Sequence, residues 1–216
     1  MNAKILGLFA VGLLAGTADA STVITFEDLS AGATLSNQYA SLGVIFAPNA
    51  FSGAGGPTTT WATNTDMTIV SSSGADVGGL GTPSLVSGNI LRSFNGWLVE
   101  NGDPSFNVLF STAVSSFSAD FAGVSNAAST RLFAYDGDTL VATAIGPTAG
   151  QFTLSLTGGH FTRIAITPGD YNDWVGVDNI TFEQVAVPPA VPLPAAAWLL
   201  LSGLGGLGLL SRRRKT

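Results

Sequence analysis

Short alternating apolar patterns dominate residues 21–187, and they constrain the fold more than any other feature of the sequence. Side chains on a β-strand point alternately to its two faces, so apolar residues at every second position predict half-buried strands. No helical period of comparable length occurs before residue 188, and we expect an all-β domain. The alternating sets are Phe106, Val108 and Phe110; Phe117, Ala119 and Phe121; Phe152, Leu154 and Leu156; and Val175 and Val177.

Shorter apolar runs at residues 23–26, 44–47 and 67–70 add further strands. The sequence Asp136-Gly137-Asp138 lies between two apolar runs, and Asp-Gly predicts a hairpin turn at this position. About ten closely spaced strands in one domain favour a two-sheet antiparallel sandwich, and we expect a jelly roll.

Charge limits the classes of partner. Charged residues make up 10% of the 216-residue chain, and the only cations in residues 21–187 are Arg92, Arg131 and Arg163. Such an acidic domain cannot neutralise a run of phosphates, so we expect no nucleic-acid partner. The chain has no cysteine, which excludes disulfides and thiolate metal sites.

The first 20 residues have the layout of a secretory signal peptide. Lys4 precedes an apolar run over residues 5–15, and Ala18-Asp19-Ala20 supplies a small-residue cleavage site. The run is shorter than the ~20 residues that span a bilayer, which argues against a membrane anchor. We expect export and cleavage after Ala20.

The last 29 residues, 188–216, form a tail of different composition. An uncharged apolar run over residues 193–210 precedes a basic cluster at 212–215. As a helix this run would be about 27 Å long, enough to span a bilayer, with its basic end on the cytoplasmic side. A plain tail anchor is the alternative interpretation.

The tail resembles the sorting signal of PEP-CTERM proteins in its VPLPA variant, because a short proline motif, an apolar helix and a basic cluster occur in that order. The resemblance implies processing by an exosortase in a Gram-negative bacterium that makes exopolysaccharide. It implies export across the inner membrane, transient anchoring there, and then a cell-surface or secreted location. The motif residues are Val191, Pro192, Leu193, Pro194, Arg212, Arg213 and Arg214.

The domain between these ends resembles secreted jelly rolls of the galactose-binding and carbohydrate-module kinds, through its pattern at residues 24–28, 39–46 and 176–182. In such a fold the first and last strands pair, which would bring Glu27 and Asp28 close to Asp178 and Asn179. Calcium takes six to eight hard oxygens, and the resemblance implies a structural calcium at this place. The alternative is that Asp178 and Asn179 cap a turn while Glu27 faces water.

Aromatic residues offer a second candidate site. Tyr171, Asn172, Asp173 and Trp174 combine flat apolar faces with hydrogen-bonding groups, which is how proteins hold sugar rings. The other candidate platforms are Trp61 and Trp97. A tryptophan that belongs to the core is the alternative.

Catalysis has little support in the sequence. His160 is the only histidine, and no cysteine or Gly-x-Ser-x-Gly motif accompanies it. We therefore expect a non-catalytic surface or matrix protein that binds extracellular polysaccharide. The alternative is a carbohydrate-active hydrolase that uses a carboxylate pair. The available carboxylates are Glu27, Asp28, Asp66, Asp120, Asp170, Asp173, Asp178 and Glu183.

Overall fold

The computed structural model describes residues 21–48, 67–73, 85–92, 105–169 and 175–185. The chain divides into two compact units, Met1–Val185 and Ala186–Thr216, and every described residue belongs to the first. The predicted signal peptide, the predicted sorting motif, the apolar run over residues 193–210 and the predicted sugar motif at Tyr171–Trp174 lie outside the described residues. No helix within the described ranges is long and apolar enough to cross a membrane.

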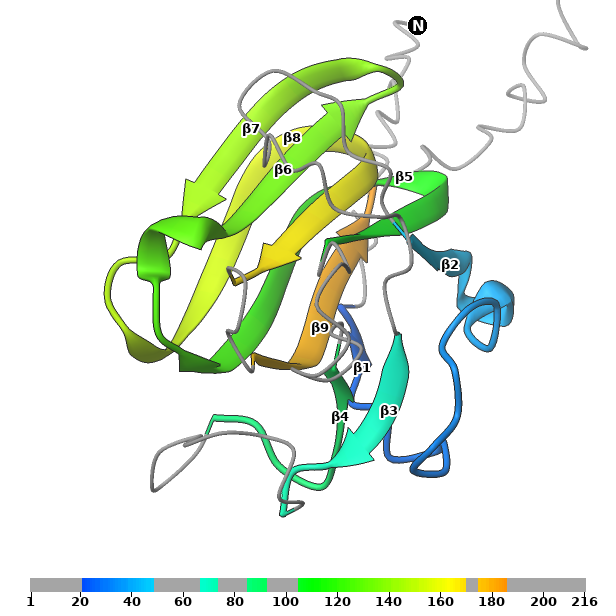
Figure 1. Ribbon diagram of the computed structural model, residues 1–216. Coiled ribbons are helices and arrows are strands. Elements are labelled where there is room, and N and C mark those ends of the chain that lie inside the picture. Colours follow the sequence, from blue (N-terminus) through cyan, green and yellow to red (C-terminus); the bar gives the residue numbers. More distant parts are fainter. Residues whose placement is uncertain (1–20, 49–66, 74–84, 93–104, 170–174, 186–216) are drawn as a thin grey trace, which may run out of the picture. The chain divides into compact units, whose positions relative to one another are not determined.

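The described part of the domain is almost entirely antiparallel β-structure, as the alternation predicts (Figure 1). Two single-turn 3₁₀ helices, η1 and η2, accompany nine strands. The elements are β1 (Thr22–Ile24), η1 (Ala40–Leu42), β2 (Val44–Pro48), β3 (Thr68–Ser71), β4 (Asn89–Arg92), β5 (Phe106–Val124), η2 (Ala127–Ser129), β6 (Thr130–Asp136), β7 (Thr139–Ile145), β8 (Gly150–Pro168) and β9 (Gly176–Gln184).

The nine strands form one continuous sheet in the order β3-β4-β9-β5-β8-β6-β7, with β1 paired to β9 and β2 paired to β5. The long strands β5 and β8 pair along most of their length, but the pairing shifts between Leu109 and Val114. The sequence predicts separate strands at residues 106–110 and 117–121. The structure joins them into one bent strand of 19 residues.

Aromatic contacts show how sharply β5 bends. Phe110 and Phe117 are seven residues apart, which is about 23 Å in a straight strand. Their ring centroids lie 6.2 Å apart, and Phe110 is also 5.2 Å from the ring of Phe182 in β9. The strand therefore folds back, and the sheet closes on itself as a sandwich-like structure.

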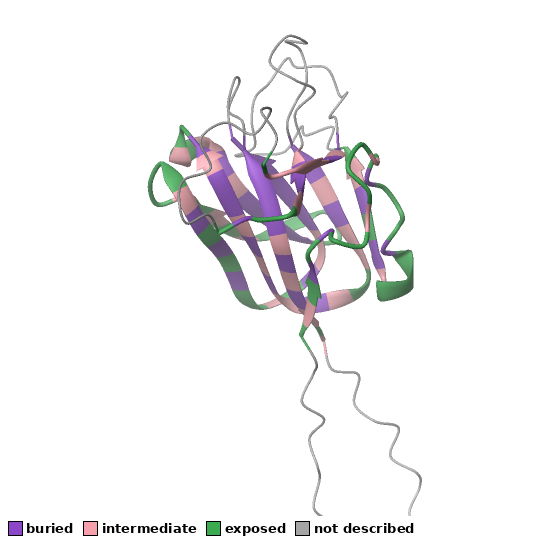
Figure 2. Cartoon of the chain, turned by 90° about the horizontal axis from the view of Figure 1, so that it is seen from below, coloured by how far each residue is buried: buried purple, intermediate pink, exposed green. Residues whose placement is uncertain are grey.

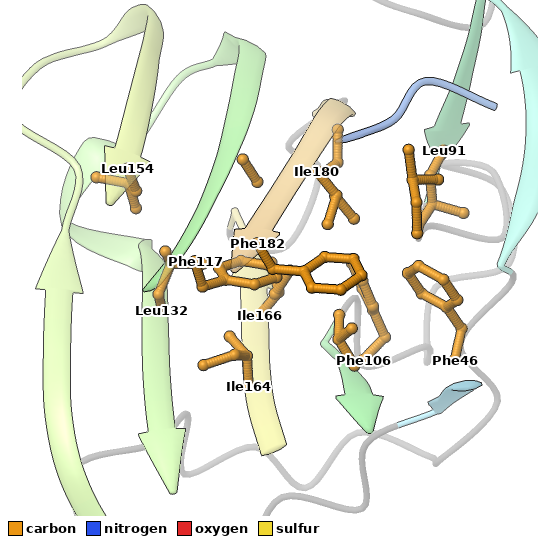
Figure 3. Packing of buried hydrophobic residues seen from close by; sticks show 14 of the residues in the cluster. Phe46, Leu91, Phe106, Phe117, Leu132, Leu154, Ile164, Ile166, Ile180 and Phe182 are labelled. Carbon is orange, nitrogen blue, oxygen red and sulfur yellow. The ribbon is translucent and has the colours of Figure 1, made fainter. Parts of the chain in front are cut away.

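One core fills the space between the two halves. Phe106 and Ile164 from one half join Phe117, Leu154 and Phe182 from the other in a single buried cluster (Figure 3). Buried and more exposed residues alternate along many of the strands, as Figure 2 shows. Burying this many large apolar side chains is the main force that closes the sheet.

The predicted Asp-Gly hairpin is confirmed. Asp136 at the end of β6 pairs with Thr139 at the start of β7, which leaves Gly137 and Asp138 as a two-residue loop. Gly137 has a φ of 58°, the left-handed conformation that such loops require.

Candidate functional site

The first and last strands of the domain pair, as the sequence predicts. In β1, Thr22 lies opposite Phe182 and Ile24 lies opposite Ile180, both in β9. Just past β1, Phe26 is fully buried with a φ of 60°, which is an unusual conformation for a residue other than glycine. Glu27 follows this turn and is thereby brought close to the middle of β9.

A β-bulge in β9 shapes the other side of the site. Ser118 pairs with Thr181 and Asp120 pairs with Asp178, so β9 carries one more residue than β5 between these pairs. Asn179 lies in the bulge with a φ of 48°. Its side-chain nitrogen donates to Oδ2 of Asp120 at 2.9 Å and to the carbonyl oxygen of Leu85 at 3.2 Å.

The segment 85–89 supplies backbone amides to the carboxylates. The amide of Ser87 donates to Oδ2 of Asp178 at 3.2 Å, and the amide of Asn89 donates to Oε1 of Glu27 at 2.9 Å. Between them, Gly88 has a φ of 65°, and a Cβ there would lie 1.8 Å from Oε1 of Glu27. The positive φ favours glycine at this position, and any side chain here would also have to displace the Glu27 carboxylate.

Asp178 is the buried member of this cluster, at 2% exposure. Burial, with a smaller contribution from the negative charges of Asp120 and Glu27, raises its pKa to about 6, against the lowering effect of the hydrogen bonds from Asn179 and Ser87. Its Oδ1 accepts the amide of Asn179 at 2.7 Å. Three acidic side chains therefore influence one another here: Glu27, Asp120 and Asp178.

Asp28 does not join its sequence neighbour Glu27. Its Oδ1 accepts the hydroxyl of Tyr39 at 2.5 Å. Burial, the hydrogen bond and the charge of Asp28 together raise the pKa of Tyr39 well above its usual range. Of the four predicted calcium ligands, Glu27, Asp178 and Asn179 gather around residues 85–89, while Asp28 anchors the buried ring of Tyr39.

In the sequence, Asp120 is only one of several candidate carboxylates. Its place in the cluster comes from the pairing of β5 with β9, and no local motif signals it. Thr153 of β8 donates its hydroxyl to Oδ1 of Asp120, which extends the network to a third strand.

The oxygen donors of the cluster are of the kind that a hard cation takes. In the part of the chain that the structure describes, no group of three or more His, Cys, Asp or Glu side chains is placed to hold a metal ion by itself. Calcium also accepts amide and backbone carbonyl oxygens, which Asn179 and Leu85 carry. The amides of Ser87 and Asn89 already stabilise two of the carboxylates.

The predicted sugar-binding aromatics belong to three segments outside the described residues, and the structure describes the residues that flank each segment. These segments are 49–66, 93–104 and 170–174. Pro48 pairs with Phe106, and Arg92 pairs with Gly176, so the residues that flank the segments are strand partners. Because β5 folds back at its bend, these flanking residues lie at the ends of the strands remote from the bend.

His160 lies on the surface. Its Nδ1 is 3.1 Å from Oδ1 of Asp136, and the two side chains are 58% and 48% exposed. Within the described residues, no hydroxyl group is hydrogen-bonded to His160. The pair has an orienting carboxylate but lacks a nucleophile beside it.

No protein-family model matches this chain, and no curated protein matches it. Among solved structures, it is similar to the K2 cleaved adhesin domain of Lys-gingipain, with a TM-score of 0.46 and 13% identity, over 76% of this chain and 99% of that one. It is also similar to the K3 cleaved adhesin domain of Lys-gingipain from Porphyromonas gingivalis W83, with a TM-score of 0.34 and 13% identity over the same shares of the two chains.

Proposed function

We propose that this chain is a non-catalytic surface protein of a Gram-negative bacterium, sorted by an exosortase and built to bind extracellular polysaccharide. The observation that carries the proposal is the tail, in which a Pro192-Leu193-Pro194 motif, an uncharged run over residues 193–210 and four basic residues follow one another. The predicted signal peptide at one end and the membrane-length run at the other support a location of residues 21–187 outside the inner membrane.

The pairing of β1 with β9 supports this arrangement. Because Thr22 lies opposite Phe182, the two ends of the domain leave it side by side. A domain held by its tail from that end presents its remote end outward. The strand ends beside Pro48, Arg92 and Gly176 belong to that remote end.

We assign polysaccharide binding to the remote end. The segments that begin and finish there contain Trp61, Trp97, Tyr171 and Trp174. Flat aromatic rings pack against the C–H faces of sugars, and the acidic charge of the domain favours a neutral or cationic polymer over a polyanion.

A structural calcium ion completes the proposal. Glu27, Asp178 and Asn179 are three of the four ligands expected from the sequence, the fourth being Asp28, and Asp120 and the Leu85 carbonyl lie in the same network. An ion between the carboxylates would offset their mutual repulsion and fix the turn after β1 against β9. Its role would be to stabilise the fold.

The alternative, hydrolysis by a carboxylate pair, needs an acid and a base that are open to substrate. Asp178 has the raised pKa of a general acid, but it is 2% exposed and both of its oxygens accept backbone amides. Its environment is that of a structural residue.

Mass spectrometry of the surface form tests the sorting proposal. In a host with the matching exosortase, the mature protein should begin at Ser21 and lack the residues from Leu193 onward. A surface form that ends at Thr216 would rule out sorting and leave a plain tail anchor.

A pull-down on the host's own exopolysaccharide tests binding separately. Wild-type protein should be retained, and Trp174→Ala should weaken retention. Leu42→Ala removes a 41%-exposed apolar side chain from η1 and should not weaken it. Equal retention of both variants and wild type would remove the assignment to the aromatic segments.

A further inference from the structure

The two edge strands of the sheet differ in whether other backbone segments cover them. Strand β3 is the edge strand on one side of the sheet, and the segment 32–35 covers it. The amide of Gly32 donates to the carbonyl oxygen of Ile69 at 2.7 Å, and the amide of Ile69 donates to the carbonyl oxygen of Ala33 at 2.8 Å. The amide of Phe46 in β2 donates to the carbonyl of Ser36 at 2.7 Å. These contacts satisfy backbone groups that would otherwise be open to another strand.

Strand β7 ends the other side of the order and pairs only with β6 (Figure 1). Ala142 and Ala144 lie opposite Ala134 and Leu132, and the amide of Gly146 donates to the carbonyl of Thr130 at 2.8 Å. Since an antiparallel strand directs the backbone groups of alternate residues to one neighbour, those of Thr143 and Ile145 point outward. Among the described residues, no backbone group bonds to this outer edge.

The side chains of β7 leave the edge unprotected. Leu140, Val141 and Ile145 are 40%, 48% and 52% exposed. The strand reads Thr-Leu-Val-Ala-Thr-Ala-Ile and has neither the charge nor the proline that commonly blocks an edge. A bulge at Val141 lies near the hairpin, and residues 142–145 beyond it pair regularly.

Charge indicates which partner fits. The domain is acidic, so two copies repel each other over most of their surfaces. Strand β7 is uncharged, so an antiparallel copy of itself can approach without opposing like charges. A two-fold axis beside the strand would pair each outward backbone group with a group on the second copy.

We propose that β7 is a self-association edge, at which two copies of this chain join antiparallel and continue the sheet from one molecule into the next. The partner is a second copy of the chain. The inference stands on the described strands alone and does not depend on sorting or on polysaccharide binding.

Cysteine cross-linking tests the proposal in the full-length chain, because the natural sequence has no cysteine. Thr143→Cys and Ile145→Cys each place one thiol on the proposed edge, and Ser155→Cys places one on an exposed position of β8 as the matched control. Opposed residues in paired strands have the Cα spacing that a disulfide needs. Mild oxidation followed by a non-reducing gel should give a homodimer for at least one edge variant, at several times the yield of the control.

A second variant separates pairing from chance collision. Thr143→Pro removes an outward-facing N–H that bonds nothing in the described part of the molecule, so the fold should survive and circular dichroism should stay unchanged. Combined with Ile145→Cys, it should cut the dimer yield several-fold. Equal cross-linking at Ser155 and at the edge, insensitivity to the proline, or cross-linking to a different protein would overturn the proposal.

Discussion

Asp120 of β5 and Asp178 of β9 lie directly opposite each other, although like charges at such a position destabilise a sheet. The bulge at Asn179 makes this tolerable, because the Asn179 side chain bonds to Asp120 while its amide bonds to Asp178. Burial is the main cause of the raised pKa of Asp178, and the charge of Asp120 raises it further.

The first prediction concerns pH. The pKa of Asp178 rises from an ordinary 3.8 to about 6 on folding, so the folded state holds its proton more tightly than the unfolded state. The resulting stabilisation is complete below about pH 4 and is lost as pH rises through 6. A shift of this size corresponds to at most about 3 kcal/mol. Urea unfolding of residues 21–187 without calcium should show this loss, and Asp178→Asn should remove it. An identical pH profile for the variant would contradict the assignment.

The second prediction concerns calcium. A hundredfold excess of the ion over its dissociation constant should stabilise the domain by about 2.7 kcal/mol, which raises melting by roughly 5 to 11 °C. Glu27→Gln keeps an acceptor for the Asn89 amide but removes the charge, so it should abolish the difference between calcium and chelator. Glu183→Gln is the matched control and should leave the difference intact. Equal melting of the wild-type domain in calcium and in chelator would exclude the site.

The third prediction compares two glycines. Gly88 and Gly137 both have positive φ, but a Cβ at Gly88 would collide with the Glu27 carboxylate, whereas a Cβ at Gly137 meets nothing within 4 Å. Gly137→Ala should cost about 1 to 2 kcal/mol from backbone conformation alone. Gly88→Ala should cost clearly more, because it also displaces Glu27 from the amide of Asn89. Denaturant midpoints decide the comparison, and equal losses would mean that the contact with Glu27 contributes nothing.

The fourth prediction concerns the tail. Replacing Arg212, Arg213 and Arg214 by Ala removes most of the charge that, in the proposed topology, fixes the C-terminus on the cytoplasmic side. Retention in the inner membrane and removal of the tail should both fall. Membrane fractionation and the mass of the surface form measure these effects, and Thr216→Ala serves as a neutral control.

Local chemistry predicted much of the fold. Asp136-Gly137-Asp138 specified its hairpin, and the period-two runs located most strands, because turn conformation and strand amphipathicity are properties of a few neighbouring residues. The bend of β5 could not be predicted, because residues 110–114 include no Gly or Pro to mark it. Its cause is the packing of Phe110 against Phe117 and Phe182, which is a long-range contact.

The candidate site likewise has a part that the sequence predicted and a part that it could not predict. The pairing of first and last strands followed from the expected topology and brought Glu27 towards Asp178. The partner of Asp28 is a tyrosine 11 residues away, and the amides that hold Glu27 and Asp178 come from residues 87 and 89. Any residue type except proline can supply a backbone amide, so the sequence could not predict that these carboxylates already accept hydrogen bonds.

The pairing of β1 with β9 also sets the order in which the domain can be completed. In a chain that crosses a membrane N-terminus first, Thr22 emerges at the start, but its partner Phe182 follows about 160 residues later. The edge of β9 that receives β1 therefore does not exist until almost the whole domain is across. Until then the apolar side of β1 and the turn at Phe26 have nowhere to pack, and the contacts that join them form slowly because they span so long a loop. The fold is complete only when its final strand arrives, so a chain exported in this way would stay unfolded enough to pass a membrane pore for nearly the entire passage.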